Sequence, residues 1–290
     1  FSRPSTEAEE PIRAAEDFVL RWRGREEQTR VYPAYGPHAI YTCTQKTLGD
    51  VARLAKRDGV LVHTHISETA GENEDCLARL GLTPTKAMQE TGLFENRVLA
   101  AHCIYLEHED FSVFRAHDAS ISYNPVSNLK LCSGILPLEK AFESGVRVSI
   151  GTDGPQSNNS LDILRDLKIG SLIQKNRLGD PEFLPARQAL RMATGDGAAA
   201  LGMNKEIGSL EVGKRADIIA LGLDRANMFP MRTEDPECVY SQVVYSASGA
   251  NVTDVYVDGE CLMKDRVPQR VDRREILQRA RQASKQWKRR

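Results

Sequence analysis

Between about residues 30 and 200 the chain alternates short apolar segments with helix-forming segments, and this order restricts its fold more than any other feature. The apolar segments are rich in Val, Ile and Ala and turn polar only at their carboxyl ends, which is typical of strands buried on both faces. Repeated strand–helix order predicts an α/β fold with a parallel sheet or barrel. The clearest strand candidates are 59–66, 96–105, 119–125 and 146–154, and the clearest helix candidates are 48–59, 83–92, 106–118 and 136–145.

The pattern changes after about Gly202. Residues 206–223 and 251–266 are typical of β-hairpins, and the second segment contains Asp258-Gly259, a dipeptide that favours a tight turn. We infer a small β domain. The chain ends in a basic helix candidate, 272–290, with a narrow apolar stripe. We expect a solvated helix packed on the main body, in preference to a nucleic-acid-binding one, because charge runs seldom act alone.

Charge and cysteine content narrow the range of partners. The chain has 39 basic and 40 acidic residues, so its net charge of −1 gives no electrostatic reason to expect nucleic acid or membrane as a partner. No apolar run approaches the roughly 20 residues that span a bilayer. The six cysteines include no CxxC pair, and we interpret them as free thiols of a cytoplasmic protein.

Chemically capable side chains follow the strand candidates. In parallel barrels the active site is built at the carboxyl ends of the strands, so such side chains should meet there. His63 shares a strand face with the next histidine but lies one layer deeper, and we expect a buried core residue in preference to a metal ligand. His108 and His117 are expected at the surface. The strand-end residues are His38, His65, Glu68, His102, Asn124 and Asp153.

Histidine together with carboxylate suits a catalytic zinc, which keeps one position open for water and lowers the pKa of that water from about 15.7 to roughly 7. Iron accepts the same ligands. A serine nucleophile has little support, because no GxSxG elbow is present. A nucleotide phosphate site has no support from the sequence, because no Walker or GxGxxG loop is present.

Six motifs together resemble the amidohydrolase superfamily, and within it the deaminases of 5′-methylthioadenosine and S-adenosylhomocysteine. The motifs are PHAIYTC, VHTHISET, AHC, NPVSNLKLCSGILPL, GTDGPQSNNSLD and IGSLEVGKRADII, and they cover nearly the whole chain. Triazine hydrolases and guanine deaminases share much of this set and remain alternatives. Ile40 stands where these deaminases usually have proline after PHA.

The resemblance implies a role for each strand-end group. His65 resembles a metal ligand, and Asp153 resembles the aspartate that both ligates metal and accepts the proton of the attacking water. Glu68 resembles the acid that shuttles protons to the substrate. His102 resembles the histidine that orients the metal-bound water. These roles fit the chemistry of deamination. Glu68 can protonate the ring nitrogen beside the attacked carbon while Asp153 accepts a proton from the attacking water, so both charge changes are stabilised by a side chain at the site.

The resemblance also implies substrate contacts. His38 matches the substrate-contacting histidine of the family, and Glu68 and Asp153 also face the substrate. Arg13 falls where such enzymes hold the amino-acid carboxylate of homocysteine, although a surface helical arginine is an equal alternative. A nucleoside-like small molecule is therefore the expected ligand, and similar enzymes lead us to expect a homodimer.

One family feature is missing from the given residues. The first barrel strand of the family carries an HxH metal-binding pair, and no strand with that pattern precedes Arg13. The resemblance thus implies strands four to eight of an eight-stranded barrel in residues 1–202, and a β-sandwich with a C-terminal helix in 203–290. Half of the zinc ligands should be lacking. A non-catalytic binding module is the remaining alternative, of a different class.

Overall fold

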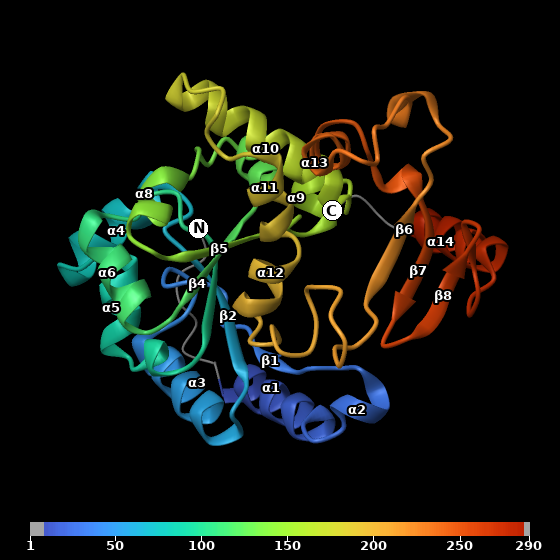
Figure 1. The fold of residues 1–290 in the computed structure, drawn as a ribbon. Coiled ribbons are helices and arrows are strands. Elements are labelled where there is room, and N and C mark those ends of the chain that lie inside the picture. Colours follow the sequence, from blue (N-terminus) through green and yellow to red (C-terminus); the bar gives the residue numbers. More distant parts are fainter. Residues whose placement is uncertain (1–8, 287–290) are drawn as a thin grey trace.

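The computed structural model describes residues 9–286, and its centre is a five-stranded parallel sheet in the order β1-β2-β3-β4-β5 (Figure 1). Sequential order with parallel pairing requires a crossover after every strand, and helices provide these crossovers. The predicted parallel α/β fold is confirmed. The strands are β1 (Ala34–Tyr35), β2 (Leu61–Ile66), β3 (Val98–His102), β4 (Ser120–Tyr123) and β5 (Arg147–Ile150).

Helices α3, α4, α5, α6 and α8 lie along one side of this sheet (Figure 1). Thr44 and Thr83 cap the amino ends of α3 and α5, and Gly59 ends α3 in the left-handed region with φ 67°. The helices are α1 (Glu9–Trp22), α2 (Glu26–Thr29), α3 (Gln45–Asp58), α4 (Ala70–Leu80), α5 (Pro84–Glu90), α6 (His108–Ala116), α7 (Pro125–Lys130), α8 (Leu138–Glu143), α9 (Pro155–Asn158), α10 (Ile163–Leu178), α11 (Ala186–Met192), α12 (Gly195–Ala200), α13 (Pro236–Tyr245) and α14 (Arg273–Gln286).

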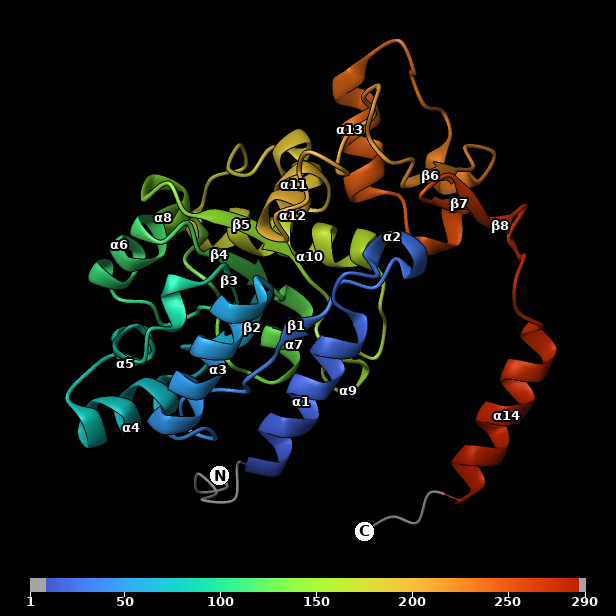
Figure 2. The ribbon, with the colours of Figure 1, turned by 90° about the horizontal axis from the view of Figure 1, so that it is seen from below.

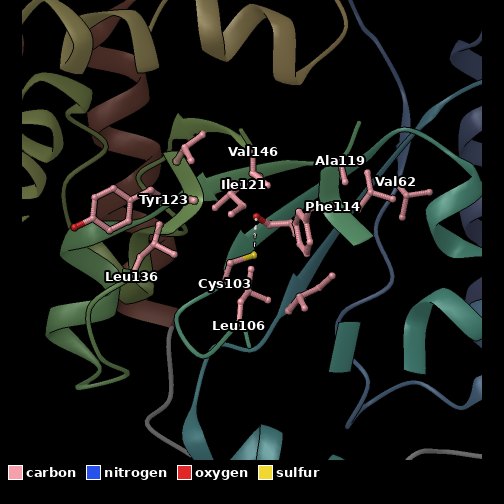
Figure 3. Packing of buried hydrophobic residues seen from close by; sticks show 14 of the residues in the cluster. Val62, Cys103, Leu106, Phe114, Ala119, Ile121, Tyr123, Leu136 and Val146 are labelled. Atoms are coloured by element: carbon pink, nitrogen blue, oxygen red, sulfur yellow. Dashed lines mark hydrogen bonds between the residues drawn. The ribbon is translucent and has the colours of Figure 1, made fainter. Parts of the chain in front are cut away.

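The main core lies between the sheet and these helices. Figure 3 shows Val62, Ile121 and Phe114 packed there, each fully buried. β2 alternates as its sequence predicts, because Val62 and Ile66 point into this core while His65 faces the other side. His63 also faces that other side and is exposed. The prediction of a buried His63 is therefore wrong, because no described element covers this part of an open sheet face.

A four-stranded antiparallel sheet, ordered β6-β7-β8-β9, follows the parallel sheet. Asp258 and Gly259 both take positive φ values, 51° and 77°, at the turn between β7 and β8, which confirms the hairpin. Within residues 9–286 this sheet has no second sheet packed on it to complete a sandwich, so the β-sandwich stays a prediction, as do the domain limits. The strands are β6 (Ile218–Leu221), β7 (Val252–Val257), β8 (Glu260–Lys264) and β9 (Val267–Pro268).

Two helices near the carboxyl end of the chain behave differently. Helix α13 returns to the parallel-sheet part and packs against α10 and α11. Helix α14 projects away from the rest of the chain (Figure 2), and Ile276, Leu277 and Ala280 are all exposed. The expectation that this helix packs on the main body is wrong, because its apolar stripe is too small to offset the entropy of docking. No helix in the described part of the chain has the length and apolar character to cross a bilayer.

Candidate active site

The carboxyl ends of the parallel strands surround a cavity of about 480 Å³. Five of the six strand-end residues named from the sequence line this cavity, which confirms that the strand ends converge. Asn124 is buried at the start of α7 and Arg13 is exposed on α1, and neither lines the cavity. The lining residues are His38, His65, Glu68, His102, Leu131, Asp153, Gly154, Pro155, Gln156 and Ser157.

Three residues at these strand ends have a left-handed backbone. Ser67 has φ 51°, His102 has φ 72° and Asp153 has φ 59°, values that few non-glycine residues adopt. Such conformations persist only where the surrounding structure imposes them, and they cluster at functional sites. These unusual backbone conformations therefore lie in the same three chain segments in which the sequence predicts functional residues.

His65 is held by the end of the neighbouring strand. Its ring Nδ1 lies 2.7 Å from the carbonyl oxygen of His38, and its backbone N–H donates to the same oxygen at 3.0 Å. A ring N–H donated to a backbone carbonyl is the common arrangement behind a metal-bound histidine, because it leaves Nε2 with a free lone pair. The His65 ring stacks against His102 with a centroid separation of 5.4 Å.

His102 and Glu68 face each other across the cavity. The side chain of His102 is buried, and its Nε2 lies 4.0 Å from Oε2 of Glu68. Nδ1 of His102 is 2.7 Å from Oδ1 of Asn128, and the hydroxyl of Ser133 donates to Oε1 of Glu68 at 3.2 Å. Each of the two groups thus has one side held by the protein and the other open to the cavity.

Asp153 accepts hydrogen bonds from the chain around it. The hydroxyl of Ser127 donates to its Oδ2 at 2.5 Å, and the backbone N–H of Gly154 donates to its Oδ1 at 2.6 Å. Burial raises the pKa of Asp153, but the hydrogen bonds from Ser127 and Gly154, with the nearby His102 and a further hydrogen bond from Ser157, together outweigh burial and hold the pKa below its usual value. Asp153 is therefore a carboxylate at neutral pH, as a metal ligand must be.

Glu72 supports the Glu68 loop from behind. Its carboxylate accepts the backbone N–H of Ser67 at 3.2 Å and that of Glu68 at 2.7 Å. Burial raises the pKa of Glu72 to about 7. The two backbone contacts fix the direction in which Glu68 leaves the end of β2.

His65 and Asp153 are the residues that could hold a metal. Both have free lone pairs, both face the cavity, and both have the supporting hydrogen bonds that metal ligands usually have. Within residues 9–286, however, no three His, Cys, Asp or Glu side chains are grouped so that they could hold an ion. The donor set therefore fits part of a metal site, since a catalytic zinc normally takes three protein ligands.

His38 lines the cavity from the β1 side. Its Nδ1 is 2.9 Å from the hydroxyl of Thr42, and its ring lies 4.6 Å from that of His65 between centroids. Partial desolvation of the ring, and after it the neighbouring His65, lower the pKa of His38. His38 is therefore neutral at physiological pH, and its Nε2 is available to a ligand.

Known proteins resemble this chain along nearly its whole length. The description "Amidohydrolase family" matches residues 1–262. The chain belongs to the amidohydrolase family. A 5-methylthioadenosine/S-adenosylhomocysteine deaminase of Syntrophomonas wolfei is 39% identical over 96% of the chain, and a 5'-deoxyadenosine deaminase of Methanosarcina acetivorans is 39% identical over 96%.

A solved structure supports the fold of this amidohydrolase. It is a zinc-bound protein from Xanthomonas campestris described as an adenosine deaminase, with 32% identity, a TM-score of 0.90 and coverage of 98% of this chain. The chain spans 64%, 62% and 63% of the lengths of these three proteins, respectively. The described part therefore has an amidohydrolase fold built on a parallel α/β sheet.

Four side chains of this amidohydrolase site were not assigned from the sequence. They are buried polar residues that contact a cavity residue or its backbone, and two of them are next to each other in α7. Three of them lie in the motif NPVSNLKLCSGILPL and the fourth follows VHTHISET by three residues, but nothing in the sequence indicates which polar residue points inward. The four are Glu72, Ser127, Asn128 and Ser133.

Proposed function

We propose that this amidohydrolase chain carries the proton-transfer side of a hydrolytic deaminase that acts on an adenosine thioether, such as 5′-methylthioadenosine or S-adenosylhomocysteine. The observation that carries the proposal is the placement of Glu68, His102 and Asp153 around one cavity, with Glu68 and His102 4.0 Å apart. The names of the two similar deaminases support the substrate class. We further propose that the five parallel strands are strands four to eight of the barrel, and that the active protein is a homodimer.

Hydrolytic deamination forms a bond from water oxygen to the ring carbon and breaks the bond from that carbon to the amino nitrogen. Glu68 donates a proton to the ring nitrogen beside the attacked carbon. Asp153 accepts one proton of the water and passes it to the amine, which leaves as ammonia. His102 orients the attacking water, and the last hydroxyl proton restores Glu68. Every proton that the reaction moves thus has a named side chain.

His65 and Asp153 would hold a divalent cation. When bound, zinc or iron supplies the Lewis acidity that makes water a nucleophile at neutral pH. The zinc-bound Xanthomonas campestris structure supports this choice of metal. Because two protein ligands fall short of the usual three, we propose that further ligands come from an HxH strand outside these 290 residues.

Substrate contacts are assigned to His38 and, for a substrate with a carboxylate, to Arg13. Neutral His38 can accept or donate a hydrogen bond at Nε2. Arg13 lies exposed on α1, so its contact requires the substrate to extend beyond the cavity.

Metal content and turnover test the proposal together. We would compare the 290-residue chain with a version extended upstream by a strand carrying HxH, measuring zinc by mass spectrometry and deamination by the loss of adenine absorbance. The extended protein should hold one zinc per protomer and deaminate methylthioadenosine. The shorter chain should do neither.

Two neighbouring histidines give a matched control. His65→Gln should remove zinc from the extended protein, whereas His63→Gln, on the same face of β2, should retain it. A zinc-loaded extended protein that releases chloride from a chlorotriazine faster than ammonia from methylthioadenosine would overturn the substrate assignment. A short chain that holds one zinc and turns over would show that His63 is a ligand after all.

A further inference from the structure

One short segment contacts all three groups that move or orient protons. We propose that residues 127–133, in α7 and the turn after it, are a positioning segment in which Asn128 selects the tautomer of His102. In the same segment, Ser127 and Ser133 direct the carboxylates of the cavity. The proposal rests on the proposed function for its kinetic consequence, but the tautomer can be measured without turnover.

The segment buries its uncharged polar side chains and exposes its two leucines. Ser127, Asn128 and Ser133 are 0%, 1% and 5% exposed, whereas Leu129 and Leu131 are 40% and 51% exposed. This is the reverse of the usual order, in which leucine is buried and serine and asparagine are exposed. Burying polar groups costs free energy unless they form hydrogen bonds. Each of the three residues forms one side-chain hydrogen bond to a cavity residue, and the amide Nδ2 of Asn128 is buried without a partner among the described residues.

Asn128 and His102 form a buried pair. Oδ1 of Asn128 lies 2.7 Å from Nδ1 of His102, and an amide oxygen can only accept, so Nδ1 carries the proton. Nε2 then has a lone pair directed at the cavity, where it can accept a hydrogen bond from water. The opposite amide orientation would place the proton on Nε2 and remove that acceptor.

The two serines act on the carboxylates. Ser127 donates to Oδ2 of Asp153 at 2.5 Å, and Ser133 donates to Oε1 of Glu68 at 3.2 Å. Each serine occupies one oxygen of its carboxylate and so fixes the rotation of the group about its last bond. Hydrogen bonds of this kind preorganise reacting groups before substrate arrives.

Backbone contacts make the segment a single unit. The N–H of Leu131 donates to the carbonyl of Ser127 at 2.9 Å, and the N–H of Ser133 donates to the carbonyl of Asn128 at 2.8 Å. The ammonium of Lys130 donates to the carbonyl of Gln156 at 2.7 Å, in the short helix α9 that follows Asp153. The segment is therefore tied both to itself and to the opposite wall of the cavity.

The first experiment determines the tautomer in the 290-residue chain. Long-range proton–nitrogen NMR correlations of the neutral His102 ring identify which nitrogen carries the proton. We expect the Nδ1–H form in the natural sequence and in Ser149→Ala, a control that also removes a buried serine hydroxyl but one that donates to the carbonyl of Ile121. Asn128→Ala should populate both tautomers, and Asn128→Asp, which keeps the acceptor, should restore Nδ1–H.

An Nε2–H ring in the natural sequence would overturn the proposal, and so would an unchanged tautomer in Asn128→Ala. The measurement on the natural sequence stands even if Asn128→Ala does not fold. In the zinc-loaded extended protein, Asn128→Ala should lower kcat by about 10- to 100-fold with KM within about twofold, and Asn128→Asp should recover part of the loss. A higher KM with an unchanged kcat would contradict a positioning role for Asn128. If neither the parent protein nor any variant deaminates methylthioadenosine, but the His102 tautomers are those expected above, the proposed function fails and the positioning role of Asn128 stands.

Discussion

The two sides of the cavity are built differently. On the side of β3, β4 and β5, His102 and Asp153 each have a buried hydrogen-bond partner from α7. On the side of β1, His38 is exposed and its ring is hydrogen-bonded to a single threonine hydroxyl, and Arg13 is exposed on α1, outside the cavity. The groups assigned to proton transfer are therefore fixed before substrate binds, whereas the groups assigned to substrate binding remain accessible.

Glu68→Gln is expected to have the largest effect. A glutamine can fill the same space but cannot donate the proton, so kcat of the zinc-loaded extended protein should fall about 100- to 10,000-fold while KM changes little. Steady-state deamination kinetics would measure both constants. His38→Gln should show the reverse, mainly a rise in KM, and a similar loss of kcat in the two variants would remove the distinction between the two sides.

Glu72→Gln should change how stability depends on pH. The pKa of this carboxyl is raised from 4.5 to about 7 in the folded protein, so the folded state holds the proton over a range where the unfolded state has lost it. The parent protein should therefore lose about 3 kcal/mol of unfolding free energy between pH 4.5 and 7, and the variant should lack this slope. Urea unfolding at several pH values measures it. Glu74→Gln, exposed on the same helix, should keep the parent slope.

Gly151→Ala should destabilise the ordered side. A Cβ on Gly151 would lie 2.4 Å from Oδ1 of Asn124 and 2.6 Å from the hydroxyl of Ser122, both buried. Such overpacking costs about 1 to 3 kcal/mol. Gly154→Ala is the matched control, because nothing lies within 4 Å of its added Cβ. Equal losses of unfolding free energy in the two variants would contradict the packing argument.

Arg13→Ala should have the smallest effect. As an exposed helical residue, Arg13 should contribute less than about 0.5 kcal/mol to stability. If it binds a carboxylate, its loss should raise KM for S-adenosylhomocysteine and leave KM for methylthioadenosine, which has no carboxylate, unchanged. Arg21→Ala on the same helix should change neither constant. Equal KM values for parent and variant on both substrates would identify Arg13 as a surface residue only.

The sequence predicted the parallel sheet and the convergence of the strand ends because both follow from local patterns. Apolar runs specify buried strands, and the carboxyl ends of parallel strands must meet at one edge. The partners Asn128 and Ser133 could not be assigned, because their direction depends on how a short helix packs, which no periodicity encodes. The prediction of a buried His63 is wrong for a related reason, since exposure of a strand face depends on which elements cover it.

The left-handed backbone at the strand ends has a consequence for how this site can change in evolution. Besides glycine, the residues that adopt positive φ most readily are asparagine, aspartate and histidine. A mutation at His102 or Asp153 that keeps the local backbone is therefore drawn from a short set, and several members of that set can carry protons or bind metals. The shape of the chain thus biases sequence drift at these two positions toward residues that still have catalytic chemistry.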